Sequence, residues 1–292
     1  MGNPTTVARV ESIREDGGVP RILAVANQKG GVAKTTTVAS LGTALTELGR
    51  RVLLVDLDPQ ACLTFSVGLD PDSLELSAND VLLGRMPASM VILPTEEGPD
   101  ILPATIDLAG CEARLLPVTG REYRLRTALE ELPDTHRYDD ILVDCPPTLG
   151  ILTVNGLTAA DQLLIPLQCE TLSHRGVGQL LDTVTDDIQR ITNPDLEVLG
   201  VLPTMYDGRT NLAREVLLDV AGRYGLRVLD PPIPRSVRFA EAPAEGRTVV
   251  GKSRRFRGAE AYRELARTLV AEARSAAPAS PRKRRPGSRA AR

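Results

Sequence analysis

Short apolar runs alternate along this chain with segments of helical periodicity. The runs are continuously apolar, as in strands buried on both faces of a parallel sheet, rather than alternating between apolar and polar. We predict strands at residues 22–26, 52–57, 141–144, 162–167, 198–202 and 227–229.

Helical periodicity, with apolar residues three and four positions apart, predicts helices between these strands. The first helix carries Val38, Leu41, Leu45 and Leu48 on one face, and Gly49 ends it. The helix predicted over 211–224 carries Leu212, Val216, Leu217 and Val220, and the one over 258–274 carries Tyr262, Leu265, Leu269 and Val270. The alternation predicts an α/β fold: a doubly wound, mostly parallel sheet flanked by helices, which binds its ligand at the carboxyl ends of the strands.

The length of 292 residues and the 42% hydrophobic content suit one large domain, which we place at 21–275. Residues 1–20 lack periodicity and are expected to form a flexible extension. Residues 276–292 combine basic residues with Pro, Ser and Ala and predict a disordered basic tail. This tail is either a solubilising segment or an arm that binds phosphates non-specifically. The net charge of −3 predicts no general affinity for nucleic acid, so any DNA contact requires a local basic surface.

Several classes of function find no support in the sequence. No apolar run is long enough to span a membrane, and the first residues do not resemble a signal peptide, so we expect a cytoplasmic protein. The 4 cysteines form no C-x-x-C pair, which disfavours a zinc site or a redox dithiol. Neither the 2 isolated histidines nor any Ser/His/Asp spacing indicates a metal or hydrolase centre.

The strongest chemical signal follows the first predicted strand, where residues 27–36 read N-Q-K-G-G-V-A-K-T-T. Backbone N–H groups and the dipole of the following helix can hold phosphates there. Lys34 can reach β- and γ-phosphate oxygens, and the Thr35 hydroxyl can ligate Mg²⁺. The expected nucleotide-binding residues are Lys29, Gly30, Gly31, Val32, Ala33, Lys34, Thr35 and Thr36. The strict Walker A pattern fails at two positions, Gln28 and Ala33.

A lysine directly before paired glycines resembles the deviant Walker A loop of ParA, MinD and the nitrogenase iron-protein relatives. This resemblance implies a P-loop NTPase fold that uses ATP and Mg²⁺, with Lys29 contacting phosphate across a dimer interface. Ala33 stands where the family usually has glycine. A negative φ there would make alanine harmless and a positive φ would strain the loop. Because Ala33 opens a helix, we expect the harmless case.

Two further segments resemble the same family. Residues 56–60, D-L-D-P-Q, are similar to its switch segment, in which Asp58 would orient or deprotonate the attacking water and Asp56 would have a structural or metal-shell role. Residues 141–147, I-L-V-D-C-P-P, look like its Walker B strand, in which Asp144 would hold Mg²⁺ through water. The resemblance thus implies Lys29, Lys34 and Asp58 as catalytic residues, and Thr35 and Asp144 as metal ligands.

The resemblance spans about residues 21–273 and is closest to ParA/Soj-type chromosome or plasmid partition proteins. Residues 173–176, S-H-R-G, depart from the more apolar family pattern, so details of partner contact are not carried over. Arg209 and Arg238 match the positions of the family's DNA-binding arginines, and we expect nearby Arg235 to assist. The predicted protein is a slow ATPase that dimerises with ATP, binds non-specific DNA on the nucleoid and responds to a ParB-like partner.

Alternatives remain open. A MinD-like ATPase would need an amphipathic membrane helix, and residues 278–292 contain no large apolar residue, so we expect no membrane binding. An iron–sulfur relative would need paired cysteine ligands, for which Cys111 and Cys145 are candidates. A nucleotide-binding scaffold without turnover is also possible. The cargo could be a chromosome, a plasmid, an organelle or a protein cluster.

Overall fold

The computed structural model describes residues 19–170, 173–253 and 255–276. The predicted flexible extension and basic tail therefore lie almost entirely outside the described residues.

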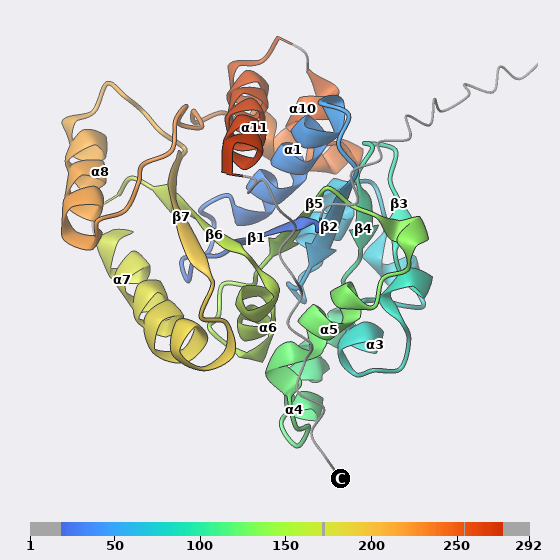
Figure 1. Ribbon diagram of the computed structural model, residues 1–292. Helices are drawn as coiled ribbons and strands as arrows, with labels where there is room; N and C mark the ends of the chain where they lie inside the picture. Colours follow the sequence, from blue (N-terminus) through green and yellow to red (C-terminus); the bar gives the residue numbers. More distant parts are fainter. Residues whose placement is uncertain (1–18, 171–172, 254, 277–292) are drawn as a thin grey trace, which may run out of the picture.

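A mostly parallel sheet forms the centre of the molecule (Figure 1). It has seven strands in the order β3-β4-β2-β5-β1-β6-β7, and the β3–β4 pair alone is antiparallel within this described sheet. The strands are β1 (Arg21–Val25), β2 (Val52–Asp56), β3 (Leu93–Pro94), β4 (Asp100–Leu102), β5 (Asp140–Asp144), β6 (Gln162–Gln168) and β7 (Glu197–Thr204). All residues of β2 and β5 are buried, as their apolar sequences predict.

Helices cover both faces of the sheet, and each face has its own apolar core (Figure 1). One face is covered by α1 (Lys34–Glu47), α10 (Val249–Lys252) and α11 (Arg257–Ala276). The other is covered by α3 (Ala78–Leu82), α4 (Cys111–Leu115), α5 (Arg124–Glu130), α6 (Ile151–Ala159) and α7 (Ser173–Thr183), the last continuing as a π-helical segment η6 (Val184–Thr192). The predicted doubly wound fold is confirmed.

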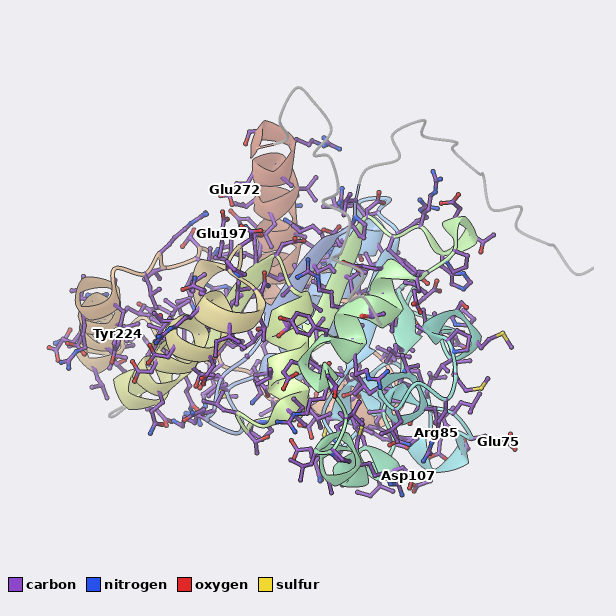
Figure 2. The ribbon with its side chains drawn as sticks, turned by 60° about the horizontal axis from the view of Figure 1, so that its bottom comes forward. Glu75, Arg85, Asp107, Glu197, Tyr224 and Glu272 are labelled. Carbon is purple, nitrogen blue, oxygen red and sulfur yellow. The ribbon has the colours of Figure 1, made fainter. Side chains whose placement is uncertain are left out.

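The remaining elements are short, apart from α8, which packs beside α7. They are α2 (Cys62–Ser66), α8 (Asn211–Tyr224), α9 (Arg238–Glu241), and the 3₁₀ turns η1 (Pro71–Ser73), η2 (Ala88–Met90), η3 (Ile106–Gly110), η4 (Arg121–Tyr123), η5 (Asp134–His136) and η7 (Pro243–Glu245). Tyr224 at the end of α8 lies against Gly178 of α7, where an added Cβ would come within 2.7 Å of the tyrosine hydroxyl (Figure 2). Gly178 therefore permits the two helices to approach.

The predicted strand at 227–229 is wrong. Val228 forms one isolated bridge with Val201, flanked by backbone hydrogen bonds at Arg227 and Leu229. Pro231 and Pro232 follow and have no N–H to donate, so the ladder is interrupted there. Contact with β7 resumes at Ile233, whose N–H donates to the Pro203 carbonyl at 2.8 Å. Conversely, β3 and β4 were not predicted, because two and three residues are too few to form a recognisable pattern.

Two predicted core positions are also wrong. Leu48 lies at the C-cap of α1 and is 41% exposed, and Leu212 at the start of α8 is 46% exposed. Each lies in the terminal turn of its helix, where the apolar stripe has passed the edge of the core. The bounds of α8 match the prediction, and Tyr262, Leu265 and Leu269 of α11 are fully buried, as predicted.

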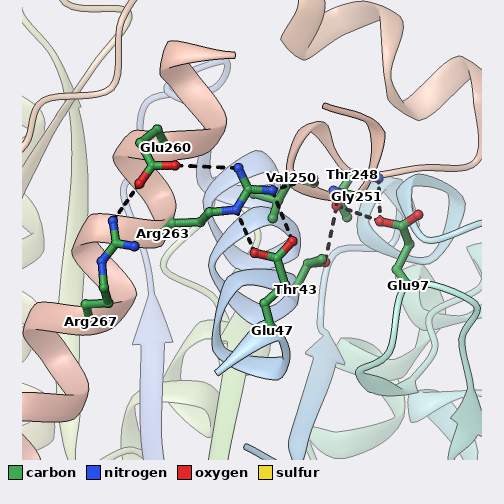
Figure 3. Close-up of polar contacts among 9 residues, drawn as sticks. All are labelled: Thr43, Glu47, Glu97, Thr248, Val250, Gly251, Glu260, Arg263 and Arg267. Atoms are coloured by element: carbon green, nitrogen blue, oxygen red, sulfur yellow. Dashed lines mark hydrogen bonds and ion pairs between the residues drawn. The ribbon is translucent and has the colours of Figure 1, made fainter. Parts of the chain in front are cut away.

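Polar contacts hold α11 and Thr248, the N-cap of α10, against α1 (Figure 3). Arg263 of α11 donates two hydrogen bonds to the Glu47 carboxylate at the end of α1, at 2.6 and 3.0 Å. Thr248 lies 3.2 Å from Thr43 of α1 and donates to Glu97 at 2.8 Å. The C-terminal helix is thus held to the helix that begins at the candidate phosphate loop.

Candidate nucleotide site

The carboxyl ends of three adjacent strands bring the predicted motifs together. Val25 at the end of β1 and Asp56 at the end of β2 both pair in register with Asp144 at the end of β5. The loop of residues 26–33 leaves β1 at this edge and enters α1 at Lys34. This edge is where the ligand site of an open parallel sheet is expected.

Long-range hydrogen bonds hold the loop in place. Asn27 is buried; its Nδ2 donates to the Pro166 carbonyl at 2.8 Å, and its Oδ1 accepts from the Lys29 N–H at 3.0 Å. Thr204 at the end of β7 donates to the Val32 carbonyl at 3.0 Å. Sequence reasoning missed both Asn27 and Thr204, because their roles depend on partners far away along the chain.

The expectation for Ala33 is wrong. Ala33 is the N-cap of α1, with φ 68° and ψ 33°, and Gly31 also has a positive φ of 73°. An N-cap lies outside the helix and need not have helical angles, so its position before α1 did not guarantee a negative φ. The left-handed region costs a residue with a Cβ on the order of 1 kcal/mol. The strained case therefore holds for this loop.

Lys34, the first residue of α1, is buried inside the loop and 7% exposed. Its Nζ donates to the Lys29 carbonyl at 3.3 Å. Burial lowers the pKa of Lys34, while the charges of Asp144 and Asp58 act to raise it. The lysine thus faces both predicted carboxylates and is surrounded by backbone rather than bulk water.

The Asp144 carboxylate is the most unusual group of the site. The residue is 1% exposed, and neither Oδ has a hydrogen-bond partner among the described residues. Burial first, and then the charge of Asp56, raise the pKa of Asp144 well above its usual range, while the Thr35 hydroxyl and Lys34 act in the opposite direction. A buried, unpaired carboxylate is costly unless a cation or a proton compensates it, so this group fits a Mg²⁺ site.

Asp56 has a structural role in its described contacts. Its Oδ2 accepts from both the backbone N–H and the hydroxyl of Thr64, at 2.9 and 2.8 Å, and its Oδ1 accepts from the Asp58 N–H at 3.1 Å. Burial raises the pKa of Asp56 to about 6 against these hydrogen bonds. Asp56 therefore fixes the switch segment, and it leaves the half-buried Asp58 carboxylate to accept from the Gln60 N–H at 3.0 Å.

Lys29 is held within its own chain. Its Nζ lies 2.7 Å from Oε2 of Glu170, which follows β6. Both side chains are partly exposed, at 40% and 51%. The sequence predicts no role for Glu170, because no local pattern connects two residues that are 141 positions apart.

The three predicted DNA-binding arginines lie on adjacent segments beyond β7. Tyr206 pairs with Pro234 in an isolated bridge, which brings the loops that carry Arg209 and Arg235 together. Arg209 is 90% exposed and makes a two-point ion pair with Asp207 at 2.9 and 2.8 Å, which lowers the pKa of Asp207 to about 2. Arg238 begins α9.

No group of three or more His, Cys, Asp or Glu side chains is arranged to hold a metal within residues 19–276 as described. Cys111 and Cys145, the candidate cluster ligands, are both buried free cysteines. A divalent cation at Asp144 would therefore share its ligands with phosphate oxygens, as Mg²⁺ does in nucleotide sites. Within the same residues, no helix has both the length and the apolar character needed to cross a membrane.

Comparison with known proteins agrees with this geometry. A family model described as an AAA domain matches residues 20–198. The chromosome partitioning protein ParA of Caulobacter vibrioides is 44% identical over 255 residues, which cover 87% of this chain and 95% of that protein. The sporulation initiation inhibitor protein Soj of Bacillus subtilis is 45% identical over 252 residues, covering 86% and 98%.

Two solved structures extend the comparison. A Mycobacterium smegmatis protein, solved as cobyrinic acid a,c-diamide synthase with an ATP analogue and magnesium, is 59% identical, with a TM-score of 0.78 over 88% of this chain and 97% of that one. The septum site-determining protein MinD of Pyrococcus horikoshii, complexed with Mg-ADP, is 26% identical, with a TM-score of 0.67 over 87% and 98%.

A phosphate loop that enters a buried helix, with acidic strand ends beside it in a doubly wound sheet, defines a P-loop NTPase. The lysine before the paired glycines marks the deviant Walker A class within it. With relatives more than 40% identical over nearly their whole length, this chain belongs to the ParA family of the ParA/MinD superfamily of ATPases.

Proposed function

We propose that this chain binds ATP with Mg²⁺ and hydrolyses it slowly, and that the bound nucleotide controls dimerisation and DNA attachment. The observation that carries the proposal is the buried Asp144 carboxylate, which has no described hydrogen-bond partner and faces Lys34 and Thr35. Such a group needs a cation or a proton to compensate its charge, and beside a loop built for phosphates Mg²⁺ is the fitting cation. The similar M. smegmatis structure with an ATP analogue and magnesium supports this assignment.

In this proposal each residue of the site has a defined task. Loop N–H groups of residues 30–36 and the Lys34 ammonium bind the phosphates, and Thr35 and Asp144 hold Mg²⁺, which offsets phosphate charge. Asp58 orients the attacking water and accepts its proton. With one half-buried carboxylate as base, slow turnover is expected. A ParB-like partner would accelerate it, by analogy with the family.

Dimerisation would join two arginine surfaces. Lys29 of each subunit would leave Glu170 and bind the nucleotide of the other subunit. Arg209, Arg235 and Arg238 of both subunits would then contact DNA phosphates with little sequence preference. Two surfaces acting together bind much more tightly than either one alone, which makes attachment depend on the nucleotide.

DNA mobility shift with ATP, ADP or no nucleotide tests this proposal. We expect binding only with ATP, and its loss in Lys34→Ala and in the Arg209→Ala/Arg238→Ala double variant. The matched control is Arg223→Ala/Arg267→Ala, which removes two exposed arginines from α8 and α11 that form ion pairs elsewhere. Four phosphate contacts per dimer predict at least a tenfold weaker affinity for the first pair and about no change for the control.

Binding indifferent to nucleotide, or equal losses in both arginine pairs, would contradict the proposal. If the protein binds ATP and dimerises but does not bind DNA, we would infer that it positions another cargo. The similarity to MinD supports this alternative.

The M. smegmatis comparison also raises ATP-dependent amide synthesis as a second candidate. An amidation that takes its nitrogen from glutamine needs a reactive cysteine thiolate. Burial raises the pKa of all four cysteines here, that of Cys111 and of Cys169 to about 11. A role in partition therefore fits the chain better than amide synthesis. Incubation with cobyrinic acid, ATP and either glutamine or ammonia, with the products analysed by mass spectrometry, tests this choice, and formation of the amide would favour the second candidate.

A further inference from the structure

Aromatic side chains are scarce in this protein, and three of them meet at one place. The chain has 3 Phe, 5 Tyr and no Trp. Phe239 and Phe256 meet edge to face with centroids 5.5 Å apart, and Phe239 meets Tyr262 in the same way at 6.2 Å. These three rings, the aromatic cluster, connect α9, the segment before α11, and α11 itself.

The outer end of the aromatic cluster supports an arginine. The Arg238 guanidinium lies over the Phe256 ring, 5.1 Å from its centroid. Arg238 has no ion-pair partner among the described residues, unlike Arg209, which Asp207 holds. A cation over an aromatic face is attracted to it and keeps its N–H groups free for an anion. The ring thus orients Arg238 without occupying its donors.

The inner end of the aromatic cluster is anchored beside the phosphate loop. Tyr262 is fully buried, and its hydroxyl lies 3.0 Å from the Thr37 hydroxyl in the first turn of α1. Thr37 in turn bonds through its backbone N–H to the Ala33 carbonyl at 2.9 Å. One contiguous set of contacts therefore runs from the loop to Arg238.

Gly258 makes the arrangement possible. A Cβ at this position would come within 2.5 Å of both Phe239 and Phe256. The first turn of α11 therefore accepts the two rings only because residue 258 has no side chain. A side chain there would displace the rings while leaving every aromatic residue and Arg238 present.

We propose that Phe256, supported by Phe239 and Tyr262, is the positioning residue for Arg238 and holds its guanidinium ready for a DNA phosphate. This inference rests on the proposed function, since it assumes that Arg238 contacts DNA. An exposed arginine loses rotamer freedom when it binds, and a ring that already orients it reduces this loss.

The test compares the DNA affinity of ATP-bound variants by fluorescence anisotropy. Phe256→Leu and Gly258→Ala are each expected to weaken DNA binding, with each subunit of the dimer contributing a loss of affinity of about two- to fivefold. Phe256→Tyr keeps an aromatic face under Arg238 and should bind DNA with wild-type affinity. The control Tyr123→Leu removes a partly exposed aromatic side chain in η4, outside the cluster, and leaves affinity unchanged.

A double-mutant cycle separates positioning from general damage to the fold. In an Arg238→Ala background, Phe256→Leu should have no further effect on affinity, because the group it orients is gone. Thermal unfolding of each variant shows whether the fold is intact.

Additive losses in the cycle, or no rescue by Phe256→Tyr, would overturn the inference. If wild-type protein with ATP bound no DNA, the proposed function itself would fail. Wild-type binding that is lost in Arg238→Ala but unchanged in Phe256→Leu and Gly258→Ala would overturn the positioning role alone.

Discussion

Ala33 shows how one side chain can set the energy of a phosphate loop. Its φ of 68° lies in the left-handed region, which glycine adopts without strain and alanine does not. The next residue, Lys34, begins the buried helix α1, and the Ala33 carbonyl accepts the first helical bond from Thr37. The strained conformation is therefore maintained by the helix that follows it.

Replacing Ala33 with glycine should relieve this strain. We expect Ala33→Gly to stabilise the nucleotide-free protein by up to ~1 kcal/mol, since relief of the left-handed strain exceeds the added backbone entropy of the unfolded chain. Denaturant unfolding measures the change. The matched control Ala221→Gly, inside α8, should instead destabilise by ~1 kcal/mol. Equal destabilisation in both variants would show that Ala33 is unstrained.

Asp144 predicts a conflict between stability and function. Its folded-state pKa is raised above that of the unfolded chain, so the folded protein loses stability as pH rises above about 4, where the unfolded carboxyl ionises. Asp144→Asn carries no charge and should therefore be more stable than wild type at pH 8, with a smaller gain at pH 4, where the wild-type carboxyl is protonated in the folded state and partly so in the unfolded chain.

Urea unfolding at both pH values, with and without ATP and Mg²⁺, measures this effect. Wild type should gain stability from ATP with Mg²⁺ and Asp144→Asn should not. The exposed Asp195→Asn control should match wild type throughout. If Asp144→Asn were less stable than wild type at pH 8 without ligand, the carboxylate would have a stabilising partner after all.

At the scale of elements, the sequence correctly predicted the helices and strands whose formation is decided by one local pattern of residues. The buried strands β1, β2, β5, β6 and β7 have apolar runs of their own, and α8 ends at a glycine with φ 64°. Residues 227–229 also look like a strand, but the prolines after them interrupt the pairing, so only isolated bridges form. β3 and β4 are too short to show a pattern.

The same reasoning separates the parts of the candidate site. The phosphate loop and the two acidic strand ends are each contiguous motifs, so their positions in the chain could be predicted from the sequence alone. Asn27, Thr204 and Glu170 contribute through partners 139, 172 and 141 residues away, and only the folded sheet brings those partners close. The conformation of Ala33 was likewise decided by how the loop enters α1 rather than by its neighbours in sequence.

At the scale of the whole molecule, the ion pair between Lys29 and Glu170 bears on assembly. In the proposed dimer Lys29 binds the nucleotide of the other subunit, so each subunit must first break its own 2.7 Å contact with Glu170. Both side chains are substantially exposed, and such pairs contribute up to about 1 kcal/mol. The Lys29–Glu170 pair within each subunit should therefore disfavour the dimer modestly. Because the nucleotide of the other subunit is the competing partner of Lys29, dimerisation should depend on that nucleotide.

Glu170→Gln removes the competing charge and should tighten the dimer. With two pairs broken per dimer, the dissociation constant with a non-hydrolysable ATP analogue should fall by up to about thirtyfold. Sedimentation equilibrium measures it, with the exposed Glu75→Gln, labelled in Figure 2, as the control that should match wild type. The difference should shrink at 1 M salt, where exposed charges are screened. A weaker dimer in Glu170→Gln would mean that Glu170 binds the second subunit rather than restraining Lys29.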